Sequence, residues 1–192
     1  MTLSRLALLG LFALPACDAA LDPSIDADAF AAAEEAADDI ARMPVTAQAD
    51  LPRSGTATYE GGIYATTTAG YIGQLVADMD MNVNFTNGDV SGTIDQINLI
   101  DSEGEPDQLL GGSLSIVGNA SGPALGAIAE GELRVADADG IRGATFMALG
   151  LAGDIRSGAS DGSAVYGVTT GTARGSVRFD LVDGVFYGTR ED

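Results

Sequence analysis

The sequence predicts an all-β protein, an eight-stranded antiparallel up-and-down β-barrel preceded by a short helix and linker. Three observations predict this fold class. From residue 55 onward, apolar and polar residues alternate with the period of two that is typical of strands. The chain contains 26 glycines without the three-residue period of collagen, which indicates many turns and a curved sheet. An antiparallel meander of short strands leaves exposed edges unless it closes, so we expect a barrel.

The N-terminus is typical of a targeting segment. Arg5 precedes an apolar run from Leu6 to Leu14, which is too short to span a bilayer as a helix. The next residues, Leu14-Pro15-Ala16-Cys17, resemble the lipoprotein box of bacteria, in which the cysteine is acylated and becomes the first residue of the mature protein. We therefore predict a signal peptide over residues 1–16 and lipidation at Cys17. The alternative is an ordinary secretory signal with a chance cysteine.

Residues 17–53 are rich in alanine and acids and are expected to form a helical spacer and linker. Asp22-Pro23 is a plausible helix start, and Pro44 ends the helix after about Met43. Its apolar stripe is thin, with Phe30, Ala33, Ala37 and Ile40 at helical spacing. Such a helix either packs on the domain or serves as a spacer from the membrane, and the spacer is slightly favoured. The barrel is assigned to residues 54–192.

The clearest strand covers residues 74–85. Met79, Met81 and Phe85 fall on one face and Asp78 and Asp80 on the other. Asn87-Gly88 follows and predicts a hairpin, because both residues tolerate the positive φ of a type I′ turn. The remaining strands are expected near residues 55–65, 89–100, 113–118, 126–135, 141–150, 163–179 and 185–190, with turns at Asp139-Gly140, Asp161-Gly162 and Asp183-Gly184.

Apolar side chains are expected to fill the interior of the barrel, since eight strands leave room only for side chains or one small ligand. The expected interior residues are Met79, Met81, Phe85, Ile94, Leu133, Met147 and Leu149. Asp78, Asp80, Glu130 and Glu132 then face water, which argues against a membrane barrel with its apolar outer band. The alternative orientation would crowd the lumen with carboxylates.

Composition excludes several function classes. The formal net charge is −19, and loss of Arg5 with the signal makes it −20. So acidic a surface repels nucleic acid and anionic headgroups, and membrane attachment must then depend on acyl chains. The chain has no histidine and no lysine, so Ser160 in "GASDG" has no base although the spacing fits a nucleophile elbow. We predict no enzymatic activity, no catalytic residues, no cofactor and no metal.

Carboxylates and tyrosines remain as candidates for catalytic, metal-binding or ligand-binding side chains. Asp78 with Glu130 could form a glycosidase pair, but such a pair needs an aromatic-lined cleft, and the chain has no tryptophan and spreads its acids over an outer face. The run from Asp78 to Asn84 or the acidic residues 136–140 could collect calcium, but solvation is the simpler explanation of these two stretches. Five tyrosines either anchor a ligand or plug the barrel ends, and plugging is favoured. They are Tyr59, Tyr64, Tyr71, Tyr166 and Tyr187. The acidic loop from Asp101 to Asp107 is a weak pointer to a binding surface.

Several stretches in order resemble the β-barrel domain of the transferrin-binding protein B family, a barrel shared with the factor-H-binding lipoprotein of pathogenic Neisseria. The first strand has glycine, alanine, tyrosine and glycine at 55, 57, 59 and 61. Val90, Gly92 and Ile94 match a later strand, and the glycine-rich strands up to Arg190 match the closing pair. The resemblance covers Gly55 to Arg190. It assigns no ligand-contact residue, because this chain has one barrel and no second lobe.

The resemblance implies a lipid-tethered barrel, often displayed on the outer membrane, that captures a host protein. The expected function is thus a non-enzymatic lipoprotein of the bacterial cell envelope or cell surface, attached to the membrane through Cys17, that binds a protein or small solute. Outer-membrane placement is expected, facing either the periplasm or the surface, although Asp18 resembles the inner-membrane retention signal of enteric bacteria. The alternatives are a structural envelope lipoprotein without a diffusible ligand and a lipocalin-like carrier with an internal cavity.

Overall fold

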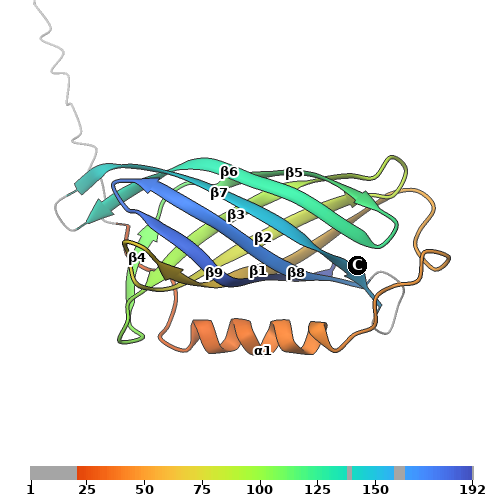
Figure 1. The fold of residues 1–192 in the computed structure, drawn as a ribbon, viewed down its shortest axis with the longest axis horizontal. Helices are drawn as coiled ribbons and strands as arrows, with labels where there is room; N and C mark the ends of the chain where they lie inside the picture. The colour runs from red at the N-terminus through yellow and green to blue at the C-terminus, as the bar shows by residue number, and fades with distance from the viewer. Residues whose placement is uncertain (1–20, 138–139, 158–162, 192) are drawn as a thin grey trace, which may run out of the picture.

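In the computed structural model the chain forms a closed β-barrel, with one helix lying along its outer wall (Figure 1). The structure describes residues 21–137, 140–157 and 163–191. The predicted all-β class and eight-stranded antiparallel barrel are confirmed, with one extra short strand.

The helix and nine strands of the described residues follow one another along the chain. They are α1 (Ala29–Ala41), β1 (Thr56–Thr68), β2 (Gly73–Asn84), β3 (Asp89–Ile100), β4 (Pro106–Leu110), β5 (Leu114–Ser121), β6 (Ala124–Asp137), β7 (Gly140–Arg156), β8 (Ala164–Gly175) and β9 (Phe179–Arg190).

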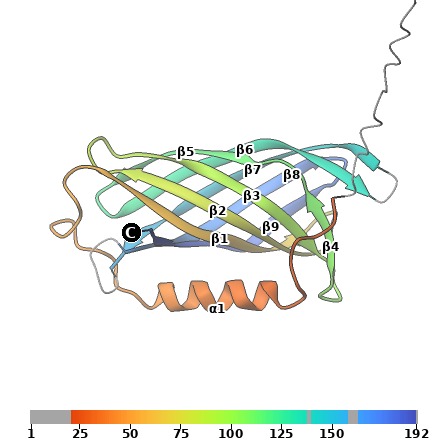
Figure 2. The same cartoon turned by 180° about the vertical axis from the view of Figure 1, so that it is seen from behind.

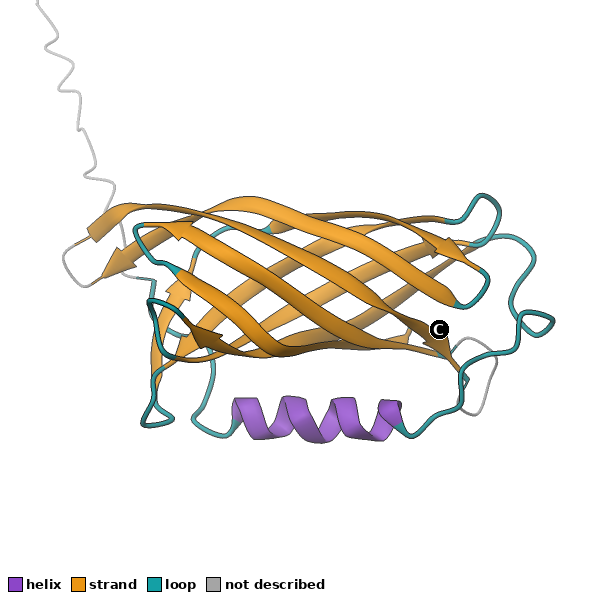
Figure 3. Ribbon diagram, in the orientation of Figure 1, coloured by secondary structure: helices purple, strands orange, loops and turns teal. Residues whose placement is uncertain are grey.

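The barrel closes because β2 pairs with β3 as well as with β1. The other neighbours are β1–β9, β9–β8, β8–β7, β7–β6, β6–β5 and β5–β3, all antiparallel. β4 and β5 together take the place of one barrel strand, because β5 pairs with the first half of β3 and β4 with the second half. Between them, Gly111 bridges to Arg134 of β6. Residues 101–112, which lie between the strands expected at 89–100 and 113–118, therefore contain a further strand. Figure 3 shows the strands slanting around the barrel.

The two ends of the barrel carry different segments (Figure 2). We call the near end the one where the described chain begins at Leu21; it carries the β1–β2 turn, the β3–β4 loop and the β8–β9 turn. The far end carries the β2–β3 and β5–β6 turns and the linker 42–55 that leads from α1 into β1. α1 runs from the near end to the far end (Figure 1).

The predicted division between interior and exterior is confirmed. Met79, Met81, Ile94, Leu133, Met147 and Leu149 are at most 2 % exposed and belong to one buried cluster, against which Phe85 packs. Asp78, Asp80, Glu130 and Glu132 are exposed. The largest fully buried side chains are Tyr59, Phe179 and Phe186. Burial raises the pKa of Tyr59 to about 12. The alternative with a carboxylate-lined lumen is wrong.

Two turn predictions need correction. Asn87-Gly88 does join β2 to β3, but only Gly88 has a positive φ, of 83°, so the turn is not type I′. Asp183-Gly184 lies inside β9, at a register shift against β8, with Asp183 at φ 51°. The actual β8–β9 turn is at residues 176–178. An aspartate–glycine pair tolerates a bulge as well as a turn, and tertiary pairing decides between them. The turns at Asp139-Gly140 and Asp161-Gly162 lie wholly or partly outside the described residues.

Helix α1 packs on the barrel instead of standing away from it. It begins at Ala29 rather than after Pro23. Ala33, Ala37 and Ile40 are buried, and the helix contacts β1, β2, β8 and β9. Of the two expectations for this segment, packing on the domain is the one that the structure shows, so α1 adds no length between the barrel and a membrane.

Three of the five tyrosines lie beneath this helix and do not plug the barrel ends. Tyr64, Tyr166 and Tyr187 belong to the apolar cluster under α1, and the ring of Tyr64 meets that of Phe30 edge to face at 5.4 Å. Tyr59 lies in the barrel interior, and Tyr71 packs against the core at the near end. Helix α1 therefore packs on the outer wall formed by β1, β2, β8 and β9.

The glycines predict a contrast in stability that tests the packing. A Cβ at Gly126, on the outer wall of β6, would meet nothing within 4 Å, whereas a Cβ at Gly153 would lie 2.8 Å from the Phe186 ring. We expect Gly126→Thr to raise the free energy of unfolding by about 0.5–1 kcal/mol, because threonine suits an exposed strand and glycine does not. Gly153→Ala should lower it. Urea unfolding measures both; equal effects of the two substitutions would contradict this packing.

Candidate functional site

A row of carboxylates crosses the outer wall formed by β1, β2 and β3. Glu60 lies opposite Asp80, and Asp78 lies opposite Asp95 in the strand register. With Gly61 and Met79 these four residues line a shallow hollow of about 240 Å³. Burial, followed by the neighbouring charges of Asp95 and Asp80, raises the pKa of Asp78. A hydrogen bond shared with Glu191 and the charge of that group raise the pKa of Glu60.

This wall does not assemble the chemistry considered from the sequence. Asp78 and Glu130 both point outward, on β2 and β6, with β3 and β5 between these strands, so they do not face each other across a lumen. Within the described ranges, no group of three or more acidic or other ligating side chains could hold a metal ion. Like charges opposite one another in a sheet are destabilising, so the row costs stability at neutral pH.

The carboxylate row predicts a pH-dependent stability. Because the pKa of Asp78 is raised, the folded protein binds the proton of this carboxyl group more tightly than the unfolded chain does. Its contribution to stability is complete below the ordinary pKa of an aspartate and is lost as the pH rises through the raised value. We expect Asp78→Asn to raise Tm at pH 7 by up to about 2 °C and to have little effect near pH 3. The gain is small because solvent screens the exposed carboxylate of Asp78. Calorimetry at both pH values measures this. Glu132→Gln on β6 is the control; an equal gain there would contradict the assignment.

A hollow at the far end lies between the linker and two strand turns. It has a volume of about 400 Å³ and is lined by Gln48, Leu51, Pro52, Arg53, Val83, Asn84, Phe85, Thr86, Asn87, Gly88, Ala120, Ser121 and Gly122. These residues offer amide and hydroxyl groups, one aromatic ring and one cation. No carboxylate occurs among the described residues that line it, in a chain with 28 acidic residues. We call this hollow the far-end cavity.

Hydrogen bonds at the end of β2, one local and two to Gly55 of the linker, hold the walls of the far-end cavity. The backbone N–H of Thr86 donates to the Asn84 carboxamide at 2.9 Å, and the Gly55 N–H donates to the Thr86 hydroxyl at 3.2 Å. The Phe85 N–H donates to the Gly55 carbonyl at 2.8 Å. Arg53 is exposed and makes no ion pair within the part of the chain that the structure describes. A charged group of a ligand could therefore reach its guanidinium.

A second hollow of about 410 Å³ lies at the near end, between the β1–β2 turn and the β3–β4 loop. The acidic loop that the sequence singled out forms one side of it, through residues 101–104. The Asp101 carboxylate accepts the N–H groups of Glu103 at 2.8 Å and Glu105 at 3.0 Å, which lowers its pKa. The carboxylate of Asp101 thus stabilises the loop to which it belongs. The same loop carries further acidic residues, which would repel an anionic ligand.

Several candidates from the sequence fall outside the described residues. They are the lipidation candidate Cys17 with its neighbour Asp18, Ser160 of the elbow-like motif, and part of the acidic stretch 136–140. The far-end cavity was missed by sequence reasoning, because its lining comes from the linker and from turns after β2 and β5. Phe85 was expected only as an interior residue.

Comparison with known proteins assigns no family to the chain. No family model matches the sequence, and no curated protein matches it at a significant level. Among the described residues, no helix is both long and apolar enough to cross a bilayer.

Proposed function

We propose that this chain is a lipid-anchored, non-enzymatic lipoprotein of the bacterial cell envelope, whose barrel resembles that of transferrin-binding protein B and binds a protein or small-solute ligand. The acyl groups are attached to Cys17, and the outer membrane is the proposed location. The lipoprotein box at residues 14–17 supports the anchor. The absence of histidine and lysine from the sequence supports a role without catalysis.

The observation that carries the binding role is the far-end cavity. Its volume of about 400 Å³ falls within the range of small-molecule sites, and it combines apolar Leu51 and Phe85 with the amides of Gln48 and Asn84. Arg53 gives it a positive charge in a strongly acidic chain. A ligand group that enters it is therefore neutral or anionic.

The filled barrel interior argues against the alternative of a lipocalin-like carrier. Tyr59, Phe179 and Phe186 are fully buried inside the barrel together with the methionines of β2. A ligand in the interior would have to displace these side chains, whereas the far-end cavity is already open.

Two measurements test the proposal. Mass spectrometry of the mature native protein is expected to show acylated Cys17 at the N-terminus, and Cys17→Ala should leave the protein unacylated in the soluble fraction. Immobilised mature protein is expected to retain one saturable, stoichiometric ligand from the growth medium or envelope of its organism. Arg53→Glu should lose this ligand and Arg178→Glu, at the near end, should keep it.

Three other results would contradict parts of this proposal. A free Cys17 with a signal cut elsewhere would overturn the anchor. Retention by Arg53→Glu equal to the unmodified protein would overturn the cavity as the binding site, and recovery of envelope proteins alone would favour a structural envelope lipoprotein.

A further inference from the structure

The described chain begins firmly attached to the near end of the barrel. The Leu109 N–H donates to the Leu21 carbonyl at 3.3 Å, and the Leu21 side chain lies over Gly111, where a Cβ would be 2.8 Å from it. Three residues later, the Ser24 N–H donates to the Asn98 carboxamide at 3.0 Å. The chain is therefore fixed to β4 and β3 from Leu21 onward, before α1 begins.

This attachment leaves a short tether. Three residues lie between Cys17 and Leu21. The four steps from one to the other span at most about 14 Å in a fully extended chain. β1 has 13 residues; a strand of that length tilted as in small barrels advances about 33 Å along the barrel axis. An acylated Cys17 can therefore bring the near end to the membrane surface, while the far end lies beyond its reach if the barrel stands upright.

The rim of the near end carries an apolar side chain that the fold leaves uncovered. Ile72, in the β1–β2 turn, is 69 % exposed. It follows Ala69 and Gly70, which are also exposed and carry no charge. An isoleucine at the tip of a turn has no role in the core, but it can enter the boundary between headgroups and acyl chains.

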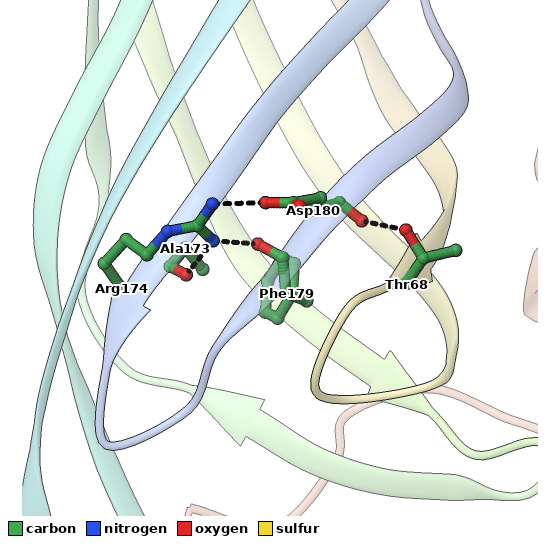
Figure 4. Close-up of polar contacts among 5 residues, drawn as sticks. All are labelled: Thr68, Ala173, Arg174, Phe179 and Asp180. Atoms are coloured by element: carbon green, nitrogen blue, oxygen red, sulfur yellow. Dashed lines mark hydrogen bonds and ion pairs between the residues drawn. The ribbon is translucent and has the colours of Figure 1, made fainter.

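The turn that bears Ile72 is held rigidly to its neighbour. The Tyr71 N–H donates to the Arg178 carbonyl at 2.7 Å, which ties the β1–β2 turn to the β8–β9 turn. Figure 4 shows how the second turn is fixed: the Arg174 guanidinium donates to the carbonyl of Phe179 at 2.9 Å and to the carboxylate of Asp180, and the Thr68 hydroxyl donates to the Asp180 carbonyl at 3.3 Å. Ile72 thus has a defined position on the rim.

We infer that the near end of the barrel rests on the membrane, with Ile72 as its apolar contact, and that the far-end cavity faces away from the bilayer. This inference depends on the proposed lipidation of Cys17. The lipid surface that fits is zwitterionic, because Asp101, Glu103 and Glu105 of the β3–β4 loop lie at the same end and repel anionic headgroups.

Single tryptophans test this orientation, since the chain has none of its own. The mature acylated protein is placed in phosphatidylcholine vesicles with brominated acyl chains, which quench tryptophan fluorescence at short range. Ile72→Trp reports the near end, Ala49→Trp the exposed linker at the far end, and Ile128→Trp the outer wall of β6, where Ile128 is 58 % exposed. We expect at least twofold stronger quenching at position 72 than at the other two. Ten glycine and serine residues inserted before Leu21 should weaken that quenching.

Each other result overturns a defined part of the inference. Quenching at position 128 equal to that at position 72 means that the barrel lies on its side, and quenching at position 49 means that the far end contacts the lipid. Acylated protein with no quenched tryptophan has no contact at the near end. Mass spectrometry of the same samples separates these results from failure of the proposed function, which would appear as an unacylated Cys17.

Discussion

Phe186→Ala is expected to lower the free energy of unfolding by about 3–5 kcal/mol, because the barrel cannot collapse around the space that the ring leaves. Phe186 is fully buried on β9. Two glycines of neighbouring strands lie against it: a Cβ at Gly167 would be 2.5 Å from the ring and a Cβ at Gly153 would be 2.8 Å from it. The ring fills the volume that these two glycines leave free. Urea unfolding followed by tyrosine fluorescence measures the loss.

A second substitution distinguishes this fit from a general loss of apolar area. Gly167→Ala places a methyl group against the Phe186 ring and against the backbone of β7. We therefore expect this substitution to destabilise strongly the protein that keeps Phe186. Combined with Phe186→Leu, which shortens the side chain, the cost of Gly167→Ala should fall by about 1 kcal/mol or more. Gly126→Ala on the open outer wall is the matched control. If the two substitutions at 167 and 186 were additive, the ring would not be packed against this glycine.

The sequence predicts the barrel well because its period of two is a local property of each strand. Residues such as Met79 and Asp80 take opposite sides of the wall whatever their neighbours are. The aspartate–glycine pairs were less informative, because the same residues suit a turn and a bulge. Asp183-Gly184 became a bulge when β9 paired over its whole length with β1 and β8.

Long-range packing was not predictable from such patterns. The tyrosines at 64, 166 and 187 come from three strands, and only the closed barrel brings them together under α1. The far-end cavity has the same origin, since its walls are joined only after the linker crosses the end of the barrel. The lipidation motif is a local signal, and it remains a prediction.

The packing of α1 on the barrel predicts a second large loss of stability, caused by a charge at position 37. Ala37 is fully buried at the centre of the face that meets the barrel, between Ala33 and Ile40. Ala37→Glu would place a carboxylate against the tyrosine cluster. The Arg156 guanidinium lies over the Tyr166 ring at 5.3 Å, but it is already bound to the carbonyls of Ala41 and Met43, so the helix leaves the new carboxylate without a free partner charge. Because burying an unpaired charge costs several kcal/mol, we expect the helix to detach and the free energy of unfolding to fall by about 2–4 kcal/mol.

The tyrosine titration reports this detachment directly. In the intact protein, burial under the helix, then the neighbouring groups led by Tyr166, raise the pKa of Tyr64. Ala37→Glu should shift the tyrosinate absorbance change to lower pH and open the linker 42–55 to proteolysis. Ala36→Glu is the matched control, since Ala36 is on the exposed face of the same helix. An unchanged tyrosine titration in Ala37→Glu would contradict the packing of α1 on the barrel. So would equal effects at positions 36 and 37, because only the buried position can distinguish a docked helix from a free one.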